Sequence, residues 1–248
     1  MKLIVYTALF ADLNISLNEV GEFIEFSHDK EDVEYIAFTN RPDLTSKFWD
    51  VRHLEVEEVS PRMQSRMIKW NPAKYLPEHT HSLWLDSQCY FTVEPKSLVN
   101  YILENDTYHT AIHHHGDLHS IYVEGMVSSY VYQTDKPEII NRQLERYFNE
   151  GHPYQYDHFE TGVLIRKSCE ASTKFNEMIR HELQNHSIRD QICTPFVVQK
   201  LRQLGDTQIK TIPETFVAHN HKNPIPKSKY FFTVPKPTEK LKEDLAKR

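Results

Sequence analysis

One acidic residue, Asp86, stands where it could hold a metal ion. The segment Trp84-Leu85-Asp86-Ser87-Gln88 is a short apolar run that ends in a carboxylate. Open α/β sheets bind their ligands at the carboxyl ends of their strands. A carboxylate at that edge can bind Mg²⁺ or Mn²⁺ against a diphosphate, although it can equally cap the turn that follows a strand. Asp86 is therefore the first candidate for a metal ligand.

Two histidines late in the chain could complete such a site. His219 and His221 directly follow the apolar residues 216–218. Imidazole is a suitable ligand for borderline metals such as Mn²⁺, so either ring could join the Asp86 carboxylate. Taken alone, the same two residues also suit solvated positions in a loop.

A row of basic residues offers a site for phosphate. Ser60-Pro61 is typical of a helix start, with a capping serine and a proline at the first helical position. Arg62, Arg66 and Lys69 follow at spacings of four and three, which puts all three on one face of that helix. Guanidinium and ammonium groups bind diphosphates well, and a solvated helix face is the ordinary alternative.

Two further carboxylates could act as a general base or hold a donor sugar. Glu160 stands just before a predicted strand over 162–166, and Asp190 stands at the first turn of a predicted helix over 187–204. A positioned carboxylate can take the proton of an attacking hydroxyl. The alternative for Asp190 is a helix cap, because helix N-termini stabilise negative charge.

Three consecutive histidines, His113 to His115, look like a metal-binding tract. Neighbouring residues on a strand point to opposite faces, so the three rings cannot all bind one ion. We expect a polar pocket rim instead, with one histidine facing the substrate and Glu124 on the same rim.

Strands that alternate with helices must position these residues, and the alternation predicts an α/β fold with a mostly parallel sheet flanked by helices. We expect one domain over 1–222 and a Pro- and Lys-rich tail over 223–248. The predicted strands cover 2–10, 35–39, 49–56, 82–86, 110–115, 162–166, 209–212 and 216–218. One predicted helix begins at residue 60 and is ended or kinked by Pro72. The other predicted helices cover 95–104, 137–150, 173–185 and 187–204.

Composition excludes several classes of protein. The net charge of −6 implies no extended basic face, so a nucleic-acid-binding protein is disfavoured. No apolar run is long enough to span a bilayer, and residues 3–11, which imitate a short signal peptide, predict a buried first strand. The three cysteines give neither a disulfide framework nor a zinc spacing. We therefore expect a cytoplasmic protein, with attachment to a membrane surface as the alternative.

Eight short segments, taken in order, resemble a known family: the glycosyltransferase-like family found in bacterial polysaccharide gene clusters, plant Golgi proteins and large-virus glycosylation proteins. The resemblance spans residues 3–204 and implies a GT-A fold, in which a Rossmann-like half binds a nucleotide-diphospho-sugar and the other half binds the acceptor. The segments are Val5–Phe10, Phe38–Asn40, Arg66-x-x-Lys69, Leu83–Asp86, Tyr122–Glu124, Gln143-x-x-x-Tyr147-x-x-x-Gly151-x-Pro153, Glu160–Arg166 and Ser187-x-Arg189-Asp190-Gln191.

The resemblance implies roles for individual residues on the donor side. The end of the first strand would meet the nucleoside, Asn40 would meet the base or ribose, and the basic helix would approach the diphosphate. The implied donor-binding residues are Tyr6, Thr7, Ala8, Asn40, Arg66, Lys69, Asp86, Ser87 and Gln191.

The implied metal site departs from the pattern of the family. Asp86 begins the position of an Asp-x-Asp motif, but the third residue here is Gln88, so one carboxylate is lost. His219 or His221 could complete a site for Mn²⁺ or Mg²⁺, and metal-independent activity is the alternative. The implied catalytic residues are Asp190 and Glu160.

We predict a glycosyltransferase that moves a sugar from a UDP-, GDP- or TDP-linked donor to a glycan, glycolipid or other hydroxyl acceptor, in polysaccharide or glycoconjugate synthesis. An inverting enzyme would use Asp190 or Glu160 as the base, whereas a retaining enzyme needs none. Gln88 supports one alternative, a degenerate module that binds nucleotide or glycan without turnover. A metallohydrolase with ligands such as Asp86, His113 and His219 is another.

Overall fold

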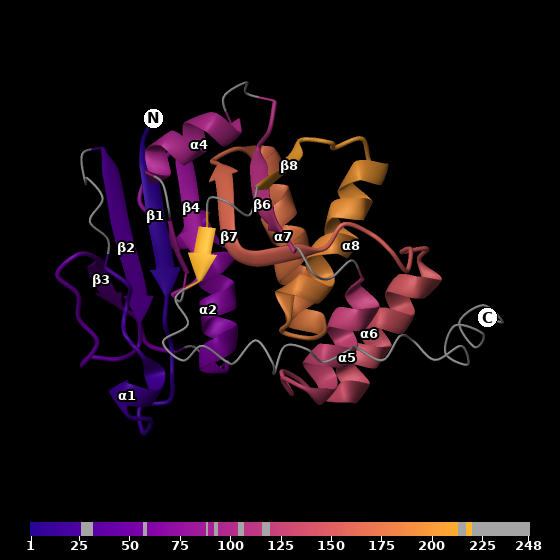
Figure 1. Ribbon diagram of the computed structural model, residues 1–248, viewed down its shortest axis with the longest axis horizontal. Helices are drawn as coiled ribbons and strands as arrows, with labels where there is room; N and C mark the ends of the chain where they lie inside the picture. Colours follow the sequence, from indigo (N-terminus) through magenta and orange to yellow (C-terminus); the bar gives the residue numbers. More distant parts are fainter. Residues whose placement is uncertain are drawn as a thin grey trace.

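The computed structural model describes residues 1–25, 32–56, 59–87, 89–91, 94–103, 107–115, 120–212 and 217–219, the last three and residues 90–91 by their backbone alone. Within these ranges, a seven-stranded sheet has the order β3-β2-β1-β4-β7-β6-β8 (Figure 1). The strands are β1 (Leu3–Ala8), β2 (Val33–Thr39), β3 (Asp50–His53), β4 (His81–Leu85), β6 (Thr110–His114), β7 (Phe159–Lys167) and β8 (Ile209–Ile212).

The sheet is mostly parallel. β7 runs antiparallel to both of its neighbours, β4 and β6, whereas every other pairing in the sheet is parallel. The carboxyl ends of β1, β2 and β4 therefore share one edge with the amino end of β7. This arrangement confirms the predicted α/β fold with a mostly parallel sheet, and it is consistent with the Rossmann-like glycosyltransferase fold that the resemblance implies.

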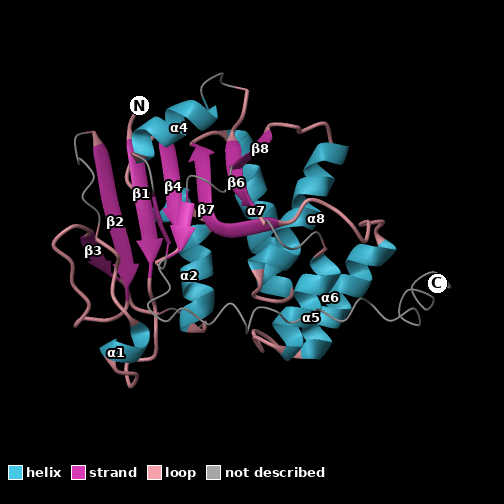
Figure 2. Ribbon diagram, viewed as in Figure 1, coloured by secondary structure: helices cyan, strands magenta, loops and turns pink. Residues whose placement is uncertain are grey.

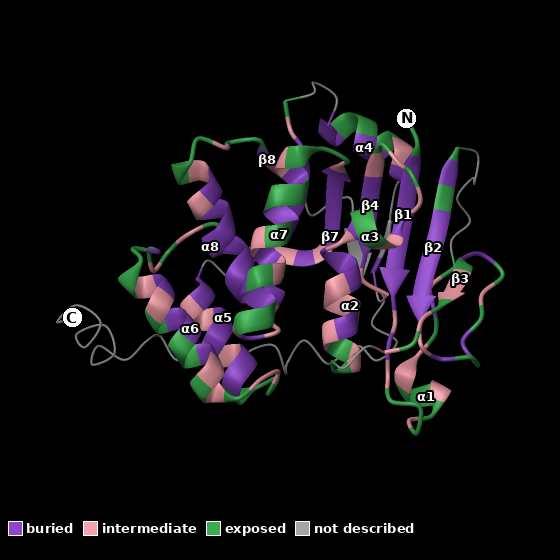
Figure 3. Cartoon of the chain, turned by 180° about the vertical axis from the view of Figure 1, so that it is seen from behind, coloured by how far each residue is buried: buried purple, intermediate pink, exposed green. Residues whose placement is uncertain are grey.

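The central strands are apolar along their whole length because both faces of the sheet are covered. All six residues of β1 are buried, and β4 is buried from its second residue onward. Helices α2 (Pro61–Lys69), α3 (Pro72–Tyr75) and α7 (Glu170–Asn185) lie over the face that is seen from behind (Figure 3). The remaining helices are α1 (Leu17–Val20), α4 (Pro95–Leu103), α5 (Ile121–Tyr130), α6 (Pro137–Asn149) and α8 (Asp190–Gln203) (Figure 2).

Helices α5 and α6 pack closely, and a glycine makes this possible. A Cβ atom at Gly125 would lie 2.4 Å from Leu144 Cδ1 and 3.1 Å from Ile140 Cγ2, so any side chain there would collide with α6. Helix α5 also packs against α8, which carries Asp190 at its first position. The helical half of the molecule is thus joined to the edge of the sheet where ligands are expected.

Most predicted elements are confirmed, with shifted ends. Pro72 does not close the helix that starts at Pro61: that helix ends at Lys69, and Pro72 begins the separate short helix α3. The N-cap positions of α6 and α8 are Lys136 and Arg189, so α8 begins at Asp190, three residues later than predicted. Helices α1 and α5 were not predicted, nor was the short strand β5 (Cys89–Phe91).

A second, two-stranded sheet joins β5 to β9 (Val217–His219), one residue later than the strand predicted over 216–218. The predicted tail over 223–248 lies outside the described residues. Cys89 and Cys193 are buried, and Cys169 is exposed. In the part of the chain that the structure describes, no helix combines the length and apolar character that a bilayer crossing requires.

Candidate active site

Lys69 joins two carboxylates from distant parts of the chain. Its ammonium lies 2.7 Å from Asp190 Oδ2 at the start of α8 and 3.6 Å from Asp86 Oδ1 just after β4. The lysine and Asp190 are fully buried, whereas the side chain of Asp86 is 26% exposed. The predicted basic helix, the predicted metal ligand and one predicted catalytic acid therefore meet at the carboxyl edge of the sheet.

The position of Lys69 follows from contacts at both ends of the residue. Ser60 caps α2 by accepting a hydrogen bond from Met63 N at 3.2 Å, which fixes where the helix begins. At the other end, the carbonyl of Lys69 accepts hydrogen bonds from Tyr6 Oη at 2.8 Å and from Arg166 Nη1 at 3.0 Å. The last turn of α2 is thereby held against β1 and β7.

Two indole rings enclose the Lys69 ammonium. Its nitrogen lies 5.7 Å from the ring centroids of both Trp70 and Trp84. Each indole also binds one of the carboxylates: Trp70 Nε1 donates to Asp190 at 3.2 Å, and Trp84 Nε1 donates to Asp86 at 2.6 Å. The cation and both acids therefore lie in an environment built from aromatic faces and aromatic N–H groups.

Asp190 is an ionised carboxylate in the protein interior. Burial alone would raise its pKa, but the charges of Arg66, whose Nη2 lies 3.4 Å away, and of Lys69 hold the pKa well below its usual range. Burial lowers the pKa of Lys69, and the two nearby carboxylates oppose that effect. A carboxylate with so low a pKa is a weak base, so this geometry favours an electrostatic role for Asp190 over proton removal.

Asp86 is held at the edge of the sheet by its own backbone. Its N–H donates to the carbonyl of Gly162 in β7 at 2.8 Å, and its carbonyl accepts from Cys89 N at 2.8 Å to close a turn. A partly exposed carboxylate at this place can meet a ligand. The prediction that Asp86 binds metal or donor is thus compatible with its position.

The second sheet places the backbone of one predicted metal ligand nearby. His219 in β9 pairs with Cys89 in β5, three residues after Asp86. Gln88 and His221 lie outside the described residues. Within the described part of the chain, no group of three or more His, Cys, Asp or Glu side chains is arranged to share an ion. Carboxylate and imidazole are both suitable ligands for Mn²⁺. The metal site at Asp86 and His219 stays a prediction.

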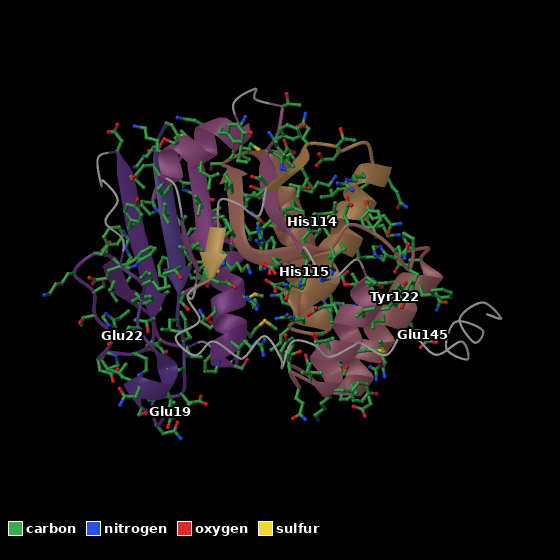
Figure 4. All side chains as sticks on the ribbon, in the orientation of Figure 1. Glu19, Glu22, His114, His115, Tyr122 and Glu145 are labelled. Atoms are coloured by element: carbon green, nitrogen blue, oxygen red, sulfur yellow. The ribbon has the colours of Figure 1, made fainter. Side chains whose placement is uncertain are left out.

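Glu160 lies against two of the three consecutive histidines. His113 Nδ1 is 3.3 Å from Glu160 Oε2, and His115 Nε2 is 3.8 Å from Glu160 Oε1. The β6–β7 register shifts between Ile112 and His113, which brings Glu160 opposite His113. His115 follows β6 directly (Figure 4). Alternate histidines therefore share one face, as the strand period predicts.

The Glu160 carboxylate is 27% exposed, and the charges of Glu160 and Asp86 both act on the buried thiol of Cys89. Burial raises the pKa of Cys89 well above its usual value, and the charges of Asp86 and Glu160 raise it further. Glu160 and Asp86 are thus two partly exposed carboxylates that both act on one buried thiol.

A third buried carboxylate supports the start of α8. Glu124 accepts hydrogen bonds from Arg189 Nε at 2.7 Å and from Ser128 Oγ at 3.0 Å, and His158 Nε2 lies 3.8 Å from its second oxygen. Burial opposes ionisation, but His158 and Arg189 lower the pKa of Glu124 to about 2. The prediction that Glu124 lines an open rim is wrong, because the side chain is buried and fixes Arg189 beside Asp190.

The three basic residues of α2 do share one face, and their exposure falls along it. Arg62 is exposed, the side chain of Arg66 is mostly buried, and Lys69 is fully buried. Although Arg62 is the most exposed of the three, the partial burial of its side chain, and then the charges of Arg66 and Arg189, lower its pKa. Arg62, Arg66 and Arg189 therefore form one positive patch above Asp190. Lys69 lies beneath that patch, and the diphosphate contact predicted for it stays a prediction.

Other predicted donor-binding residues lie around the ends of β1 and β2. Tyr6 and Thr7 are buried, and the hydroxyl of Tyr6 is bonded to Lys69 and Arg166, so a nucleoside would meet their main chain. Asn40 forms two hydrogen bonds with the backbone of Ala11, from Ala11 N at 3.1 Å and to Ala11 O at 2.8 Å. Ala8 and Gln191 are buried, and Ser87 is half-buried. The contacts of these residues with a donor stay predictions.

Sequence reasoning missed both tryptophans of this site. Trp84 stands two residues before Asp86 on a strand, so strand periodicity alone puts the two on one face and could have indicated their contact. Trp70 and Asp190 are 120 residues apart in the chain, so no local signal indicates their hydrogen bond.

Comparison with known proteins identifies the family of this chain. A search of curated proteins found no match. A family model, the TOD1/MUCI70 glycosyltransferase-like domain, matches residues 48–222. This range holds α2, the Asp86 turn, Glu160 and the start of α8. The chain therefore belongs to the TOD1/MUCI70 glycosyltransferase-like domain family.

Proposed function

We propose that the protein transfers a sugar from a nucleotide-sugar donor to a hydroxyl group of a glycan, glycolipid or other acceptor, in polysaccharide or glycoconjugate synthesis. One observation carries the proposal. Asp86, Lys69 and Asp190 converge at the carboxyl edge of a mostly parallel sheet, in a chain of a glycosyltransferase-like family. Open α/β sheets bind nucleotides at that edge.

The positive patch is suited to the leaving group. Bond cleavage at the anomeric carbon leaves negative charge on the nucleoside diphosphate, and fixed cations stabilise that charge most in a site that excludes water. Arg62 and Arg66 are the members of the basic row with side-chain surface open to solvent. We assign them the diphosphate, with Arg189 beside them.

Asp190 and Lys69 support that patch from below. A buried carboxylate between Arg66 and Lys69 fixes both cations and keeps the local charge balanced before the donor binds. We therefore assign Asp190 to positioning the cations, and not to taking the acceptor proton.

A divalent cation fits the same edge. Asp86 would hold Mn²⁺ or Mg²⁺ together with His219, His221 or the amide of Gln88, and the ion would offset charge on the leaving diphosphate. Lys69 Nζ, at 3.6 Å from Asp86, is a fixed positive charge beside the same carboxylate. In this proposal a divalent ion and the ammonium of Lys69 would both lie beside the Asp86 carboxylate.

Glu160 is the stronger candidate for a general base. Its carboxylate is partly exposed, and two imidazoles orient it. If the enzyme inverts, Glu160 takes the proton of the acceptor hydroxyl as that oxygen attacks the anomeric carbon. If the enzyme retains configuration, Glu160 instead binds a hydroxyl of the donor sugar or acceptor.

A degenerate binding module is the second candidate, and Gln88 at the third position of the metal motif is the feature that favours it. The metallohydrolase is not favoured, because His113 lies against Glu160 and not against Asp86. A cytoplasmic location, with attachment to a membrane surface when the acceptor is a glycolipid, stays a prediction.

Release of nucleoside diphosphate tests the proposal. The purified protein is incubated with UDP-glucose, UDP-galactose, GDP-mannose or TDP-rhamnose and Mn²⁺, with and without a mixture of simple glycosides, and the product is measured by chromatography. Release from one donor, stimulated by an acceptor and lost in Asp86→Asn, supports sugar transfer. Tight donor binding with no release by the wild type supports the binding module.

A further inference from the structure

The turn after α5 exposes three large side chains in a row. Tyr130, Val131 and Tyr132 are 68%, 49% and 51% exposed, although large apolar groups are usually buried. Contiguous exposed apolar surface often marks a binding site.

This turn is well ordered by its own hydrogen bonds. The amides of Val131 and Tyr132 both donate to Val127 O, at 2.9 and 3.0 Å, and Thr134 N donates to Ser128 O at 2.9 Å. Gln133 adopts a left-handed backbone with φ of 49°. A fixed turn can present an aromatic ring with little loss of conformational entropy when a ligand binds.

Tyr132 is connected directly to the candidate site. The guanidinium carbon of Arg189 lies 5.7 Å from the centroid of the Tyr132 ring, and the same guanidinium is held by Glu124 at 2.7 Å. Arg189 precedes Asp190, and Asp135 in the turn accepts a hydrogen bond from Ile188 N at 3.1 Å. The turn and the start of α8 are thus one ordered unit.

We propose that Tyr132 is a stacking platform for a pyranose ring of the acceptor, which enters the site over the turn after α5. A pyranose has a face of C–H groups that packs on the electron-rich face of a tyrosine ring, and a rim of hydroxyls that needs polar partners. Asp135, a half-buried carboxylate three residues later in the same turn, supplies such a partner.

The placement favours an acceptor sugar over the base of the donor. The proposed diphosphate cations, Arg62 and Arg66, are on α2, and the donor follows them toward the strand ends of the sheet half. Tyr132 belongs to the helical half, in the turn after α5, and contacts Arg189 just before α8. The assignment to the acceptor rests on the proposed function, whereas the stacking site itself does not.

Saturation-transfer NMR tests the platform without turnover. The probes are methyl α-D-glucopyranoside, methyl β-D-galactopyranoside, methyl α-D-mannopyranoside and methyl α-L-rhamnopyranoside, each with the full chain. We expect at least one to bind the wild type in the millimolar range, with the strongest transfer to its ring C–H protons. Tyr132→Ala should weaken that binding about three- to tenfold. Tyr132→Phe, which keeps the ring, should leave it unchanged.

The matched control is Tyr101→Ala on α4, which removes an equally exposed tyrosine, 60% exposed, from another element. A thermal melt of each variant checks that the fold is kept. Failure of all four glycosides to bind the wild type would overturn the proposal, and so would equal losses in Tyr132→Ala and Tyr101→Ala. Weaker binding of a nucleotide sugar alone in Tyr132→Ala would assign the ring to the donor base instead.

The two proposals can fail separately. Glycoside binding that depends on Tyr132, together with no release of nucleoside diphosphate from any donor, keeps the platform and rejects the transferase. Release of nucleoside diphosphate with unchanged glycoside binding in Tyr132→Ala keeps the transferase and rejects the platform.

Discussion

The ammonium of Lys69 lies 2.7 Å from Asp190 Oδ2, and neither side chain is exposed to solvent. The lysine ends α2, which packs on β1, and the aspartate begins α8, which packs on β7 and α5. One buried ion pair therefore connects the half of the molecule expected to hold the donor with the half expected to hold the acceptor. Its integrity matters for stability and for the proposed activity.

Breaking this pair on one side should be costly. Asp190→Asn leaves the buried Lys69 with only the more distant Asp86, and Lys69→Met leaves the buried Asp190 with only its arginine partners, so each should lower the free energy of unfolding, by up to about 3–5 kcal/mol. The double variant Lys69→Met/Asp190→Leu removes both charges and should recover much of that loss. Urea denaturation of the four proteins measures the cycle. Single variants that each lose under about 1 kcal/mol would show that the pair is not formed as described.

Removing the Asp86 carboxylate should separate activity from folding. Asp86 follows a strand and its side chain is 26% exposed, so Asp86→Ala should keep the fold and lower the melting temperature by only a few degrees. Release of nucleoside diphosphate should fall below detection, because the proposed metal ligand is gone. Asp50→Ala, which removes an exposed carboxylate from β3, is the control and should be fully active. Activity in Asp86→Ala equal to that of the control would reject the metal assignment.

The role of Glu160 depends on whether the enzyme inverts. For an inverting enzyme, Glu160→Gln should reduce kcat about 10²- to 10⁴-fold, since the amide cannot accept the acceptor proton. His113→Asn removes one of the two imidazoles that orient the carboxylate and should reduce kcat less. Steady-state kinetics and the anomeric configuration of the product check both points. Glu177→Gln, on an exposed face of α7, controls for loss of charge. Inversion of configuration with full activity in Glu160→Gln would exclude this base.

Glu124 should make the free energy of unfolding depend on pH in the acidic range. Its pKa of about 2 lies below the ordinary value of 4.5, so the ionised form stabilises the folded state at pH above about 4.5 and this contribution is lost as pH falls toward 2. The shift corresponds to about 3 kcal/mol at neutral pH. Glu124→Gln lacks this dependence, so the gap in unfolding free energy between it and the wild type should narrow from pH 5 to pH 3.

Denaturation curves at each pH measure that gap. Glu145→Gln, which changes an exposed carboxylate on α6 (Figure 4), should show no comparable narrowing. A gap for Glu124→Gln that stays constant from pH 5 to pH 3 would mean that Glu124 does not hold Arg189 as an ion pair.

Elements with strong local signals were predictable from the sequence. The run from Leu3 to Ala8 is apolar because a central parallel strand is covered on both faces. Gly151 and Gly205 adopt φ of 82° and 89°, the left-handed backbone that ends a helix and favours glycine. Helix α5 was missed because its apolar residues fall on every side of the helix and show no amphipathic period. The glycine at position 125 is explained by its close contact with α6, which no pattern within α5 reveals.

The individual site residues were also predictable, but not their burial. Spacing put Arg62, Arg66 and Lys69 on one face, and that spacing is the same for a solvated face as for a face that descends into the core. Only the three-dimensional structure shows that Lys69 is buried against Asp190 whereas Arg62 is exposed. Asp190 was recognisable as a helix-start acid, whereas its pairing with Lys69 depends on contacts between residues far apart in the chain.

The central claim is that this edge of the sheet binds a nucleotide sugar, and a thermal-shift screen tests it most directly. UDP-, GDP-, TDP- and CMP-sugars are added to the wild type and to Asp86→Ala, each with and without Mn²⁺. A ligand present at 100 times its Kd stabilises the folded state by about 2.7 kcal/mol and raises Tm measurably. We expect one nucleotide class to raise Tm in the wild type, more strongly with Mn²⁺, and not in Asp86→Ala. No shift with any of them at millimolar concentration would contradict the account.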